Sequence, residues 1–219
     1  NGDFTVHLED GTPLRTRKVI LAMGVRDREP DIPGIGKHAG RFLRYCPVCD
    51  GFEHTDKYLG ILGSGPTVAR HALFLRTFSN HITIFLHGKS PETLGRYAPV
   101  LAQNGISVYE PRVVRVIEDE GDLVSEYRGS GVCLEDGSEH RLSVLYGALG
   151  CELNLAPVSH LGLKLDDENY IITDCRQETS IQGIYAAGDI VSQLNQISVA
   201  FGQATIAAVE IHKALDDED

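Results

Sequence analysis

The sequence has no long apolar run and few basic residues. No apolar segment approaches the ~20 residues of a membrane-spanning helix, and Asn1 to Phe4 show neither the basic region nor the apolar run of a signal peptide. Lysine and arginine number 20 against 31 aspartates and glutamates, so the net charge is −11. This charge gives no general field to hold a phosphate backbone. We therefore expect a soluble, cytoplasmic protein that binds neither membranes nor nucleic acid.

Cysteine is scarce as well. Five cysteines in 219 residues do not make a disulfide scaffold, but two of them form a Cys46-x-x-Cys49 pattern followed by Asp50. The other three are scattered along the chain: Cys133, Cys151 and Cys175. Two thiols at this spacing can close a small disulfide ring, and an adjacent carboxylate can move the proton that a thiolate gains or loses. The pattern favours a redox-active dithiol with Asp50 as its proton carrier.

Two other interpretations of the cysteine pair stay open. A zinc site needs four ligands, and beyond the pair only His54 lies near in the sequence. The two cysteines can also be buried and unreactive, since cysteine behaves as a small apolar residue in protein cores. Because there is only one Cys-x-x-Cys, the sequence predicts no metal site.

Downstream of the cysteines, the chain has the pattern of a βαβ unit. Residues 58–62 are a short apolar run, apolar positions three or four apart predict a helix over 68–78, and residues 81–86 predict a second strand. Strand, glycine turn, helix and strand imply a parallel sheet with a right-handed crossover. With 42% hydrophobic residues, the chain can bury the core of such an α/β fold.

The turn in this unit is the predicted phosphate site. It consists of Gly63, Ser64, Gly65, Pro66 and Thr67. Glycine at the first position allows a sharp turn off the strand, and the second glycine lets the backbone approach a pyrophosphate at the helix N-terminus. Because many βα turns use glycine for structure alone, a turn without a ligand is the alternative.

The end of the second strand usually separates NAD from NADP. An acidic residue there binds the ribose hydroxyls of NAD, whereas arginine accepts the 2′-phosphate of NADP. This chain has no acid at that place, and His87 and Lys89 form a modest cationic rim. The rim favours NADP, although NAD and ordinary solvated loop charges remain alternative interpretations.

Strands are also predicted on both sides of this unit. Near the start, alternation over 4–8 predicts a half-buried strand, residues 9–11 a hairpin turn, and 18–22 a return strand that is buried on both faces. Residues 26–36, rich in proline and glycine, predict a linker. Further strands are predicted at 113–117, 123–127, 132–134 and 144–149, with a hairpin turn at 135–137.

The C-terminal part predicts a strand at 183–187 and a long alanine-rich helix over 198–215. Between them, Asp189 can accept a hydrogen bond from a sugar hydroxyl or cap the next turn, and capping is favoured when the residue is taken alone. The acidic residues 216–219 are expected to form a frayed tail.

Four segments, in their order and spacing, resemble the low-molecular-weight thioredoxin reductase family of flavin disulfide oxidoreductases. They are VILAMG at 19–24, CPVCDGF at 46–52, ILGSG at 61–65 and IYAAGD at 184–189. The resemblance implies an α/β fold in which a Rossmann-like NAD(P)-binding domain, residues 35–152, is inserted into a partial FAD-binding domain made of residues 1–34 and 153–219. The family's first FAD-binding unit is then expected before Asn1, so this chain is expected to be part of a longer enzyme.

The resemblance also implies a chemistry. NADPH, or alternatively NADH, held at the glycine turn would reduce FAD, and the flavin would reduce the Cys46–Cys49 disulfide. Cys49 would face the flavin, Cys46 would attack a thioredoxin-like protein or a small disulfide substrate, and Asp50 would be the acid–base partner. A homodimer is expected from the family, as is a domain rotation with hinges near 30–36 and 151–157.

For the flavin, the resemblance implies that Gly188 and Asp189 lie at the ribityl chain and that Asn195, Gln196 and Ile197 lie near the isoalloxazine ring. The family usually has Arg-Gln-Ala at 195–197. It also has two arginines where this chain has Gly88 and Lys89, and a smaller residue where this chain has Val68. These departures leave the cofactor preference and the substrate open.

Two alternative functions stay open at this level. An FAD-dependent dithiol oxidase would run the electron flow in reverse, closing a small-molecule dithiol into a disulfide with oxygen as the acceptor. A non-catalytic nucleotide-binding or zinc-binding module would use the same segments without electron transfer.

Overall fold

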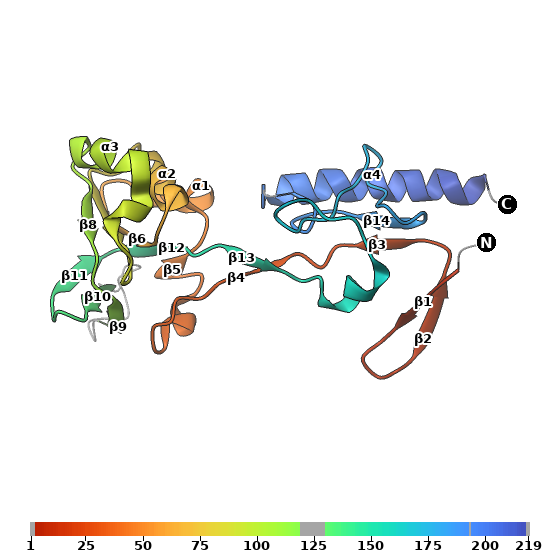
Figure 1. Cartoon of the computed structure of the whole chain (residues 1–219), viewed down its shortest axis with the longest axis horizontal. Coiled ribbons are helices and arrows are strands. Elements are labelled where there is room, and N and C mark those ends of the chain that lie inside the picture. Colours follow the sequence, from red (N-terminus) through yellow and green to blue (C-terminus); the bar gives the residue numbers. More distant parts are fainter. Residues whose placement is uncertain (1–2, 119–129, 193, 218–219) are drawn as a thin grey trace. The chain divides into compact units, whose positions relative to one another are not determined.

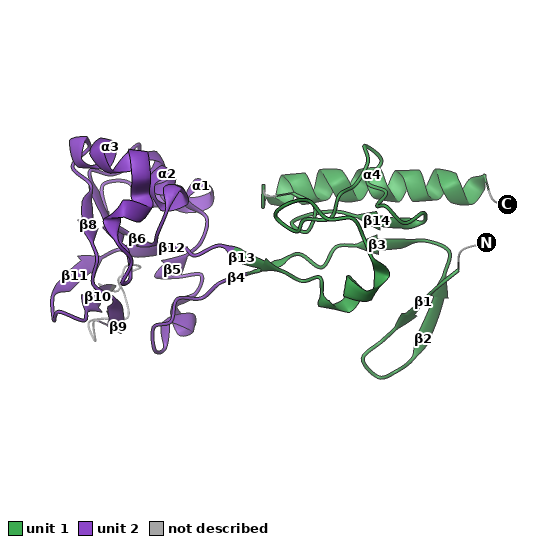
Figure 2. Cartoon of the chain, in the orientation of Figure 1, with its two compact units in different colours: residues 1–26, 151–219 green, residues 27–150 purple. Residues whose placement is uncertain are grey.

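The computed structural model describes residues 3–118, 130–192 and 194–217. The chain forms two compact units (Figures 1 and 2). Unit 1 combines Asn1–Arg26 with Cys151–Asp219, and unit 2 is Asp27–Gly150. Unit 2 is therefore inserted into unit 1 along the sequence. The units divide after Arg26 and Gly150, whereas the predicted domain boundaries lie after residues 34 and 152; the assignment of the domains to cofactors stays a prediction.

A five-stranded sheet lies at the centre of unit 2. Its strand order is β5-β12-β6-β7-β8, and each neighbouring pair is parallel, as predicted. The strands are β5 (Leu43–Arg44), β6 (Tyr58–Gly63), β7 (His81–Phe85), β8 (Ser107–Tyr109) and β12 (Val144–Ala148). Helix α2 (Pro66–Leu75) connects β6 to β7, so the predicted βαβ unit is confirmed, although the helix ends at Leu75 rather than at 78.

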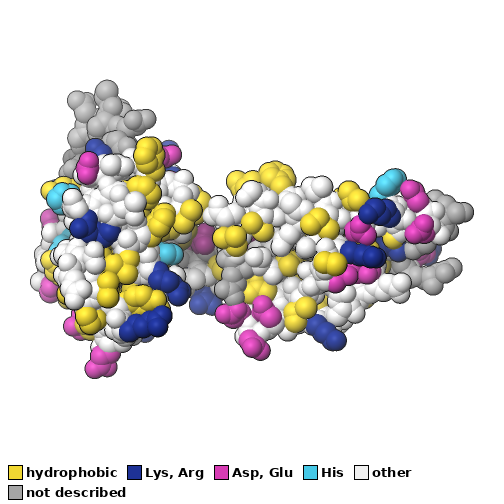
Figure 3. All heavy atoms as spheres, turned by 90° about the horizontal axis from the view of Figure 1, so that it is seen from above, with side chains coloured by type: hydrophobic (Ala, Val, Ile, Leu, Met, Phe, Trp, Pro, Cys, Tyr) yellow, Lys and Arg dark blue, Asp and Glu magenta, His cyan; other side chains and the backbone are white. Residues whose placement is uncertain are grey.

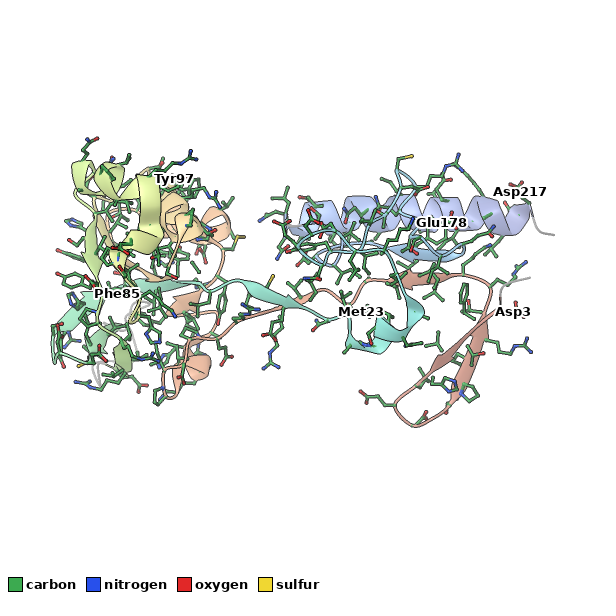
Figure 4. All side chains as sticks on the ribbon, viewed as in Figure 1. Asp3, Met23, Phe85, Tyr97, Glu178 and Asp217 are labelled. Carbon is green, nitrogen blue, oxygen red and sulfur yellow. A yellow bond between two sulfur atoms is a disulfide. The ribbon has the colours of Figure 1, made fainter. Side chains whose placement is uncertain are left out.

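The sheet is covered on both faces (Figure 1). Leu59 and Ile61 of β6 share a core cluster with Val68 of α2, whereas Leu62, on the opposite side of the strand, belongs to a second cluster with Val132. The first cluster also takes in side chains of α3 (Ala98–Gln103) and of the 3₁₀ helix η3 (Pro91–Tyr97). Phe85, labelled in Figure 4, is fully buried in the second cluster. The alternation of side chains along β6 thus builds the two interior layers.

The second face is covered by a small antiparallel sheet of order β11-β10-β9. Its strands are β9 (Val113–Ile117), β10 (Ser130–Leu134) and β11 (Glu139–Leu142). They confirm the strands predicted at 113–117 and 132–134 and the hairpin turn at 135–137. The strand predicted at 123–127 lies outside the described residues.

Unit 1 is built on a parallel pair of strands, β3 (Val19–Leu21) and β14 (Ile184–Ala186), with helix α4 (Ile197–Asp216) after β14. Leu21, Ile184 and Ala186 lie in its core cluster. Strand β14 and helix α4 confirm the two elements predicted for this region. The helix extends to Asp216, so the predicted acidic tail begins inside it.

The start of the chain differs from the prediction. The N-terminal hairpin consists of β1 (Phe4–His7) and β2 (Pro13–Thr16), whereas the expected return strand at 18–22 is β3, which belongs to another sheet. Ile20 in β3 is 39% exposed and Val6 in β1 is 40% exposed, so these strands are less buried than expected. The sequence runs on through Arg17 to β3 without a turn signal, which is why the short β2 was missed.

Short elements complete the two units. They are the 3₁₀ helices η1 (Ile35–His38), η2 (Gly51–His54) and η4 (Ala156–Leu161), the helix α1 (Pro47–Asp50), and the paired strands β4 (Val25–Asp27) and β13 (Cys151–Leu153). The predicted linker at 26–36 therefore begins as a strand and ends in η1. None of the described helices is long and apolar enough to cross a membrane.

Candidate active site

The Cys46–Cys49 pair forms a disulfide at the start of α1. Cys46 is the N-cap residue and Pro47 occupies the first helical position, where a missing N–H is tolerated. The Cys49 amide donates to the Cys46 carbonyl at 3.0 Å, which closes the turn. Cys46 is half-buried and Cys49 is exposed, so the third interpretation of the pair, two buried and unreactive cysteines, is wrong.

Asp50 follows Cys49 directly and is held by two donors from the sheet. The Tyr146 hydroxyl donates to Asp50 Oδ1 at 2.8 Å, and Arg44 Nη1 lies 3.4 Å from Asp50 Oδ2. The Asp50 side chain is only 13% exposed. A buried carboxylate needs such partners, because an unpaired charge in the interior is costly.

Two strands that are distant in the sequence bring these donors together. Arg44 in β5 and Tyr146 in β12 are register partners in a parallel pair, so their side chains lie next to each other on one face of the sheet. Tyr146 belongs to the core cluster that also contains α2, and α1 packs beside α2. Gly51 makes this close packing possible, since a Cβ there would lie 3.0 Å from Leu75 Cδ2.

His54 is the third polar residue around Asp50. It is 5% exposed, and its ring meets the Tyr146 ring edge-on with centroids 6.4 Å apart. Burial lowers the pKa of His54, and the nearby Asp50 charge opposes that shift. Within the described part of the chain, no group of three or more histidines, cysteines, aspartates or glutamates could hold a metal ion.

The predicted phosphate turn adopts a backbone that only glycine tolerates. Gly63 has φ +143°, and a Cβ there would lie 2.5 Å from the Ala148 carbonyl oxygen. Gly65 has φ +85° and is the N-cap residue of α2, with Pro66 at the first helical position. An added Cβ at Gly65 would meet no atom within 4 Å. The turn thus leaves open space at a helix N-terminus, where the unsatisfied N–H groups favour an anion, so it fits a pyrophosphate.

The remaining residues of the predicted turn are Ser64 and Thr67. Ser64 precedes Gly65 in the turn, and Thr67 lies in the first turn of α2 with an exposed side chain. The Thr67 hydroxyl accepts a hydrogen bond from Arg70 Nη2 at 3.1 Å. A cation and a hydroxyl therefore lie together beside the open turn.

The end of β7 differs from the expected cationic rim. His87 has φ +53° and Gly88 φ +81°, and the Lys89 amide bonds back to the Leu86 carbonyl, which makes a tight turn with two left-handed residues. His87 Nδ1 accepts a hydrogen bond from the Val113 amide at 3.1 Å. Burial, followed by the charge of Arg112, lowers the pKa of His87, so this side chain does not supply the positive charge assigned to it.

Arg112 takes a place in this region that the sequence did not reveal. A Cβ at Gly88 would lie 3.0 Å from Arg112 Cγ, so the arginine side chain occupies the space that a side chain at position 88 would take. Its guanidinium is 3.6 Å from the Asp31 carboxylate, which is 96% exposed. Lys89 is exposed. Two cations, Arg112 and Lys89, therefore flank the turn after β7.

The residues expected at the flavin lie in unit 1, between β14 and α4. Gly188 has φ +80°, and its amide donates to Gln203 Oε1 at 2.7 Å. Asp189 is half-buried in the turn that follows and does not cap α4, whose N-cap residue is Gln196. The expected capping of the next turn by Asp189 stays a prediction.

The segment before α4 is largely open to solvent. Asn195 is exposed and Gln196 is half-buried. Apolar side chains reach the surface of unit 1 (Figure 3), and Ile197, the first residue of α4, is 76% exposed. A carboxylate that can accept from hydroxyl groups, and an exposed apolar side chain eight positions further along the chain, fit the chemistry of a flavin with its ribityl chain.

Comparison with known proteins decides the family. A sequence profile described as pyridine nucleotide-disulphide oxidoreductase matches residues 1–204. The chain belongs to this family. The mixed α/β fold with its parallel sheet agrees with that membership, and so does the Cys46–Cys49 disulfide.

Proteins similar to this chain include two curated thioredoxin reductases and one protein with a crystal structure. The thioredoxin reductase of Mycoplasma pneumoniae is 28% identical over 218 residues, which cover 97% of this chain and 68% of that protein. The thioredoxin reductase of Bacillus subtilis is 28% identical over 206 residues, 93% of this chain and 65% of its own length. The crystal structure of HlmI is 32% identical with a TM-score of 0.88, covering 99% of this chain and 66% of that one. The chain therefore spans 65% to 68% of the length of these three relatives.

Proposed function

We propose that this chain forms the dithiol and cofactor-binding part of an NAD(P)H-dependent flavoprotein disulfide oxidoreductase of thioredoxin-reductase type. The observation that carries the proposal is the Cys46–Cys49 disulfide, which is followed directly by Asp50. The Asp50 carboxylate has two donors from the sheet, Tyr146 and Arg44. A structural disulfide has no need for such a carboxylate, whereas thiol–disulfide exchange needs a group that moves protons.

The cofactors have candidate binding residues in both units. The turn from Gly63 to Thr67 would hold the pyrophosphate of NAD(P)H, and Asp189 with the segment 195–197 would contact FAD. When bound, these cofactors supply the electron pair that opens the Cys46–Cys49 disulfide. This chain supplies the dithiol and the proton carrier, and it binds the substrate.

The proposed exchange uses Cys46, the N-cap residue of α1, together with Cys49 and Asp50 in α1. The Cys46 thiolate attacks one sulfur of the substrate disulfide, and the substrate's other sulfur leaves as a thiolate. Cys49 then attacks the Cys46 sulfur, which closes the protein disulfide and releases the second substrate thiol. Asp50 accepts a proton from a protein thiol and returns it to a leaving thiolate, so two electrons and two protons pass from the dithiol to the substrate.

For the nicotinamide cofactor we propose a preference for NADP. Lys89 and Arg112 flank the turn after β7, at the place where a 2′-phosphate is recognised in this type of fold. The ion pair between Arg112 and Asp31 is long and exposed, so it offers little competition to a phosphate. NAD is the alternative, because neither His87 nor Gly88 contributes a charge.

The proposed electron acceptor is a thioredoxin-like protein or a small disulfide. The two curated relatives are both named as thioredoxin reductases, which supports a thioredoxin-like acceptor outside the chain. We also propose a homodimer as the working form, which light scattering of the natural protein tests directly.

One experiment tests the proposed function. The natural protein that contains this chain is purified and its absorption spectrum recorded, with flavin bands expected. Its NADPH-dependent reduction of thioredoxin and of a small aromatic disulfide is then measured, for the unchanged protein and for Cys46→Ser. Activity that is lost in Cys46→Ser supports the proposal. A flavin-free protein, or one whose disulfide reduction survives Cys46→Ser, contradicts it.

A dithiol oxidase is the second candidate. The observation that favours it is that neither His87 nor Gly88 supplies a charge after β7, so the cations beside this turn are Lys89 and the sequence-distant Arg112. An oxidase would take electrons from a small dithiol through Cys46–Cys49 to FAD and then to oxygen, with no need for NADPH. Oxygen consumption with a dithiol and without nicotinamide distinguishes this candidate from the first.

A further inference from the structure

The hydroxyl group of Tyr146 is not required by packing. Tyr146 is fully buried in β12, which lies between β5 and β6 in the parallel sheet. Phenylalanine would fill the same space with apolar surface, whereas a buried phenol costs free energy unless its hydroxyl finds a partner. The partner is Asp50 Oδ1, 96 positions away in the sequence, at 2.8 Å. The one polar atom of this core side chain is therefore directed at the residue that follows the redox cysteines.

We propose that Tyr146 is a positioning residue for proton transfer at the Cys46–Cys49 pair, holding the Asp50 carboxylate in one orientation. The proposal deepens the proposed function and depends on it. A phenol that donates to a carboxylate stabilises the charge and restricts rotation of the group. Arg44 acts on the other oxygen at 3.4 Å, so each carboxylate oxygen has its own donor.

Several other ionisable groups lie around His54 and Tyr146, the two neighbours of Asp50, and they contribute to any pH profile. Arg44 comes from β5, His54 and Glu53 from η2, and Lys57 follows η2. Burial and the Asp50 carboxylate raise the pKa of Tyr146, so its hydroxyl stays protonated and remains a donor through the neutral range. His54 can titrate, so the test must separate its effect from that of Asp50.

The test uses this chain itself and needs neither FAD nor NADPH. The disulfide is reduced with dithiothreitol, the reductant is removed, and oxidised glutathione is added at pH values from about 5 to 9. Closure of Cys46–Cys49 is followed by acid quenching, alkylation of the remaining thiols and peptide mass mapping, which separates this pair from the other cysteines. In the reaction, the S–S bond of glutathione breaks, the protein S–S bond forms, and two glutathione thiols take up the electrons and protons.

Tyr146→Phe is expected to slow closure about tenfold over the whole pH range, the size expected for a lost hydrogen bond to a charged group. In an Asp50→Asn background, Tyr146→Phe is expected to have no further effect. Tyr185→Phe is the matched control, since Tyr185 is also a buried tyrosine on a parallel strand but lies in unit 1. Its profile is expected to equal that of the unchanged chain.

Thermal unfolding would reveal a folding defect in Tyr146→Phe. A second variant keeps the proposal testable if such a defect is found. Arg44 is partly exposed, and Arg44→Gln, which removes the other donor, is expected to slow closure by a smaller factor. If Asp50→Asn alters the profile while Tyr146→Phe and Arg44→Gln do not, the positioning role is wrong and the proposed function stands. An equal effect of Tyr146→Phe with and without Asp50→Asn also overturns it, because the residue then acts by another route. If Asp50→Asn changes nothing, the acid–base assignment fails and the positioning role fails with it.

Discussion

Arg112 lies across Gly88, with its Cγ at 3.0 Å from the position that a Cβ would take. Gly88 has φ +81° and forms part of the tight turn after β7, so the backbone there favours glycine over a side chain that could bind phosphate. A cation is supplied instead from the beginning of the segment that leads into β9. Positive charge therefore lies beside this turn, although it comes from another part of the sequence.

Arg112→Gln is expected to weaken binding of a 2′-phosphorylated nucleotide roughly tenfold and to leave binding of NAD almost unchanged, because one charge-assisted contact is lost. Calorimetric titration of the chain with 2′,5′-ADP and with NAD measures both affinities. Arg115→Gln is the matched control, since Arg115 is a similarly exposed arginine of β9 that pairs with Glu139 at 2.7 Å. Equal losses in the two variants would contradict a specific role for Arg112.

The two glycines of the phosphate turn are expected to respond differently to alanine. Gly63→Ala places a Cβ 2.5 Å from the Ala148 carbonyl oxygen at φ +143°, and neither backbone segment can move without breaking the β6–β12 pairing. The variant is expected to lose at least about 3 kcal/mol of unfolding free energy. Urea denaturation of the chain checks this, and an unchanged midpoint would be incompatible with the close approach.

Gly65→Ala is the counterpart. Its Cβ would meet no atom within 4 Å, so only the backbone strain at φ +85° remains, about 1–3 kcal/mol. The added methyl group would occupy the space through which a pyrophosphate approaches the α2 N-terminus. We expect a folded variant whose affinity for NADPH falls at least about tenfold, as measured by quenching of cofactor fluorescence. Full affinity in a folded Gly65→Ala would mean that the turn is not a phosphate site.

The sequence was sufficient for the elements whose signals are local. The run 58–62, the glycine turn and the spacing of Val68, Ala72 and Leu75 predict the βαβ unit, and α4 follows from its composition. Strand β2 was missed because PLRT has little strand propensity and owes its place to pairing with β1. Strand pairing across the chain is a tertiary property that short windows do not contain.

In the candidate site, too, residues close together in the sequence could be predicted and residues joined only by the fold could not. Cys46, Cys49 and Asp50 are adjacent in the sequence, so their association could be predicted. Tyr146 could not be predicted, since in the segment VLYGA it has the appearance of a core residue and its partner is 96 positions away. His87 was misjudged because its charge depends on burial and on the Val113 amide, neither of which is visible in its neighbours along the chain.

Acid stability is expected to depend on His87. Burial and then Arg112 lower the pKa of His87 below the ordinary value near 6.5, so the unfolded chain binds a proton there more readily than the folded chain. The free energy of unfolding should therefore fall as the pH drops below about 6.5, the pKa of an unperturbed histidine, and the contribution is lost fully below the folded-state value. Protonation of Nδ1 would also break its hydrogen bond with the Val113 amide.

His87→Asn is the variant that tests this dependence. Asparagine tolerates a positive φ and its side-chain oxygen can accept from the same amide without titrating. We expect similar stability at pH 7.5 and a smaller loss between pH 7 and pH 5, measured by urea denaturation. His160→Asn, at an exposed position of η4, is the control for a histidine-to-asparagine change elsewhere in the chain. A steeper loss in His87→Asn would show that the histidine does not titrate as described.

The roles of the two cysteines can be separated by trapping the intermediate of the proposed exchange. Cys49 is more exposed than Cys46 in the closed disulfide, so exposure alone favours Cys49 as the attacking sulfur, whereas the proposed function assigns the attack to Cys46. Cys49→Ser leaves the Cys46 thiolate without its resolving partner, and a stable mixed disulfide between Cys46 and the substrate should accumulate. In Cys46→Ser the corresponding adduct at Cys49 should form at least about tenfold more slowly.

Peptide mass mapping after incubation with oxidised glutathione locates each adduct, and Cys175 serves as an internal reference because it is an exposed cysteine outside the pair. Comparison with this reference corrects for general thiol reactivity. If the adduct at Cys49 forms faster than that at Cys46, the two roles must be exchanged, and Asp50 then acts on the sulfur of the neighbouring residue rather than on the one at the helix N-cap.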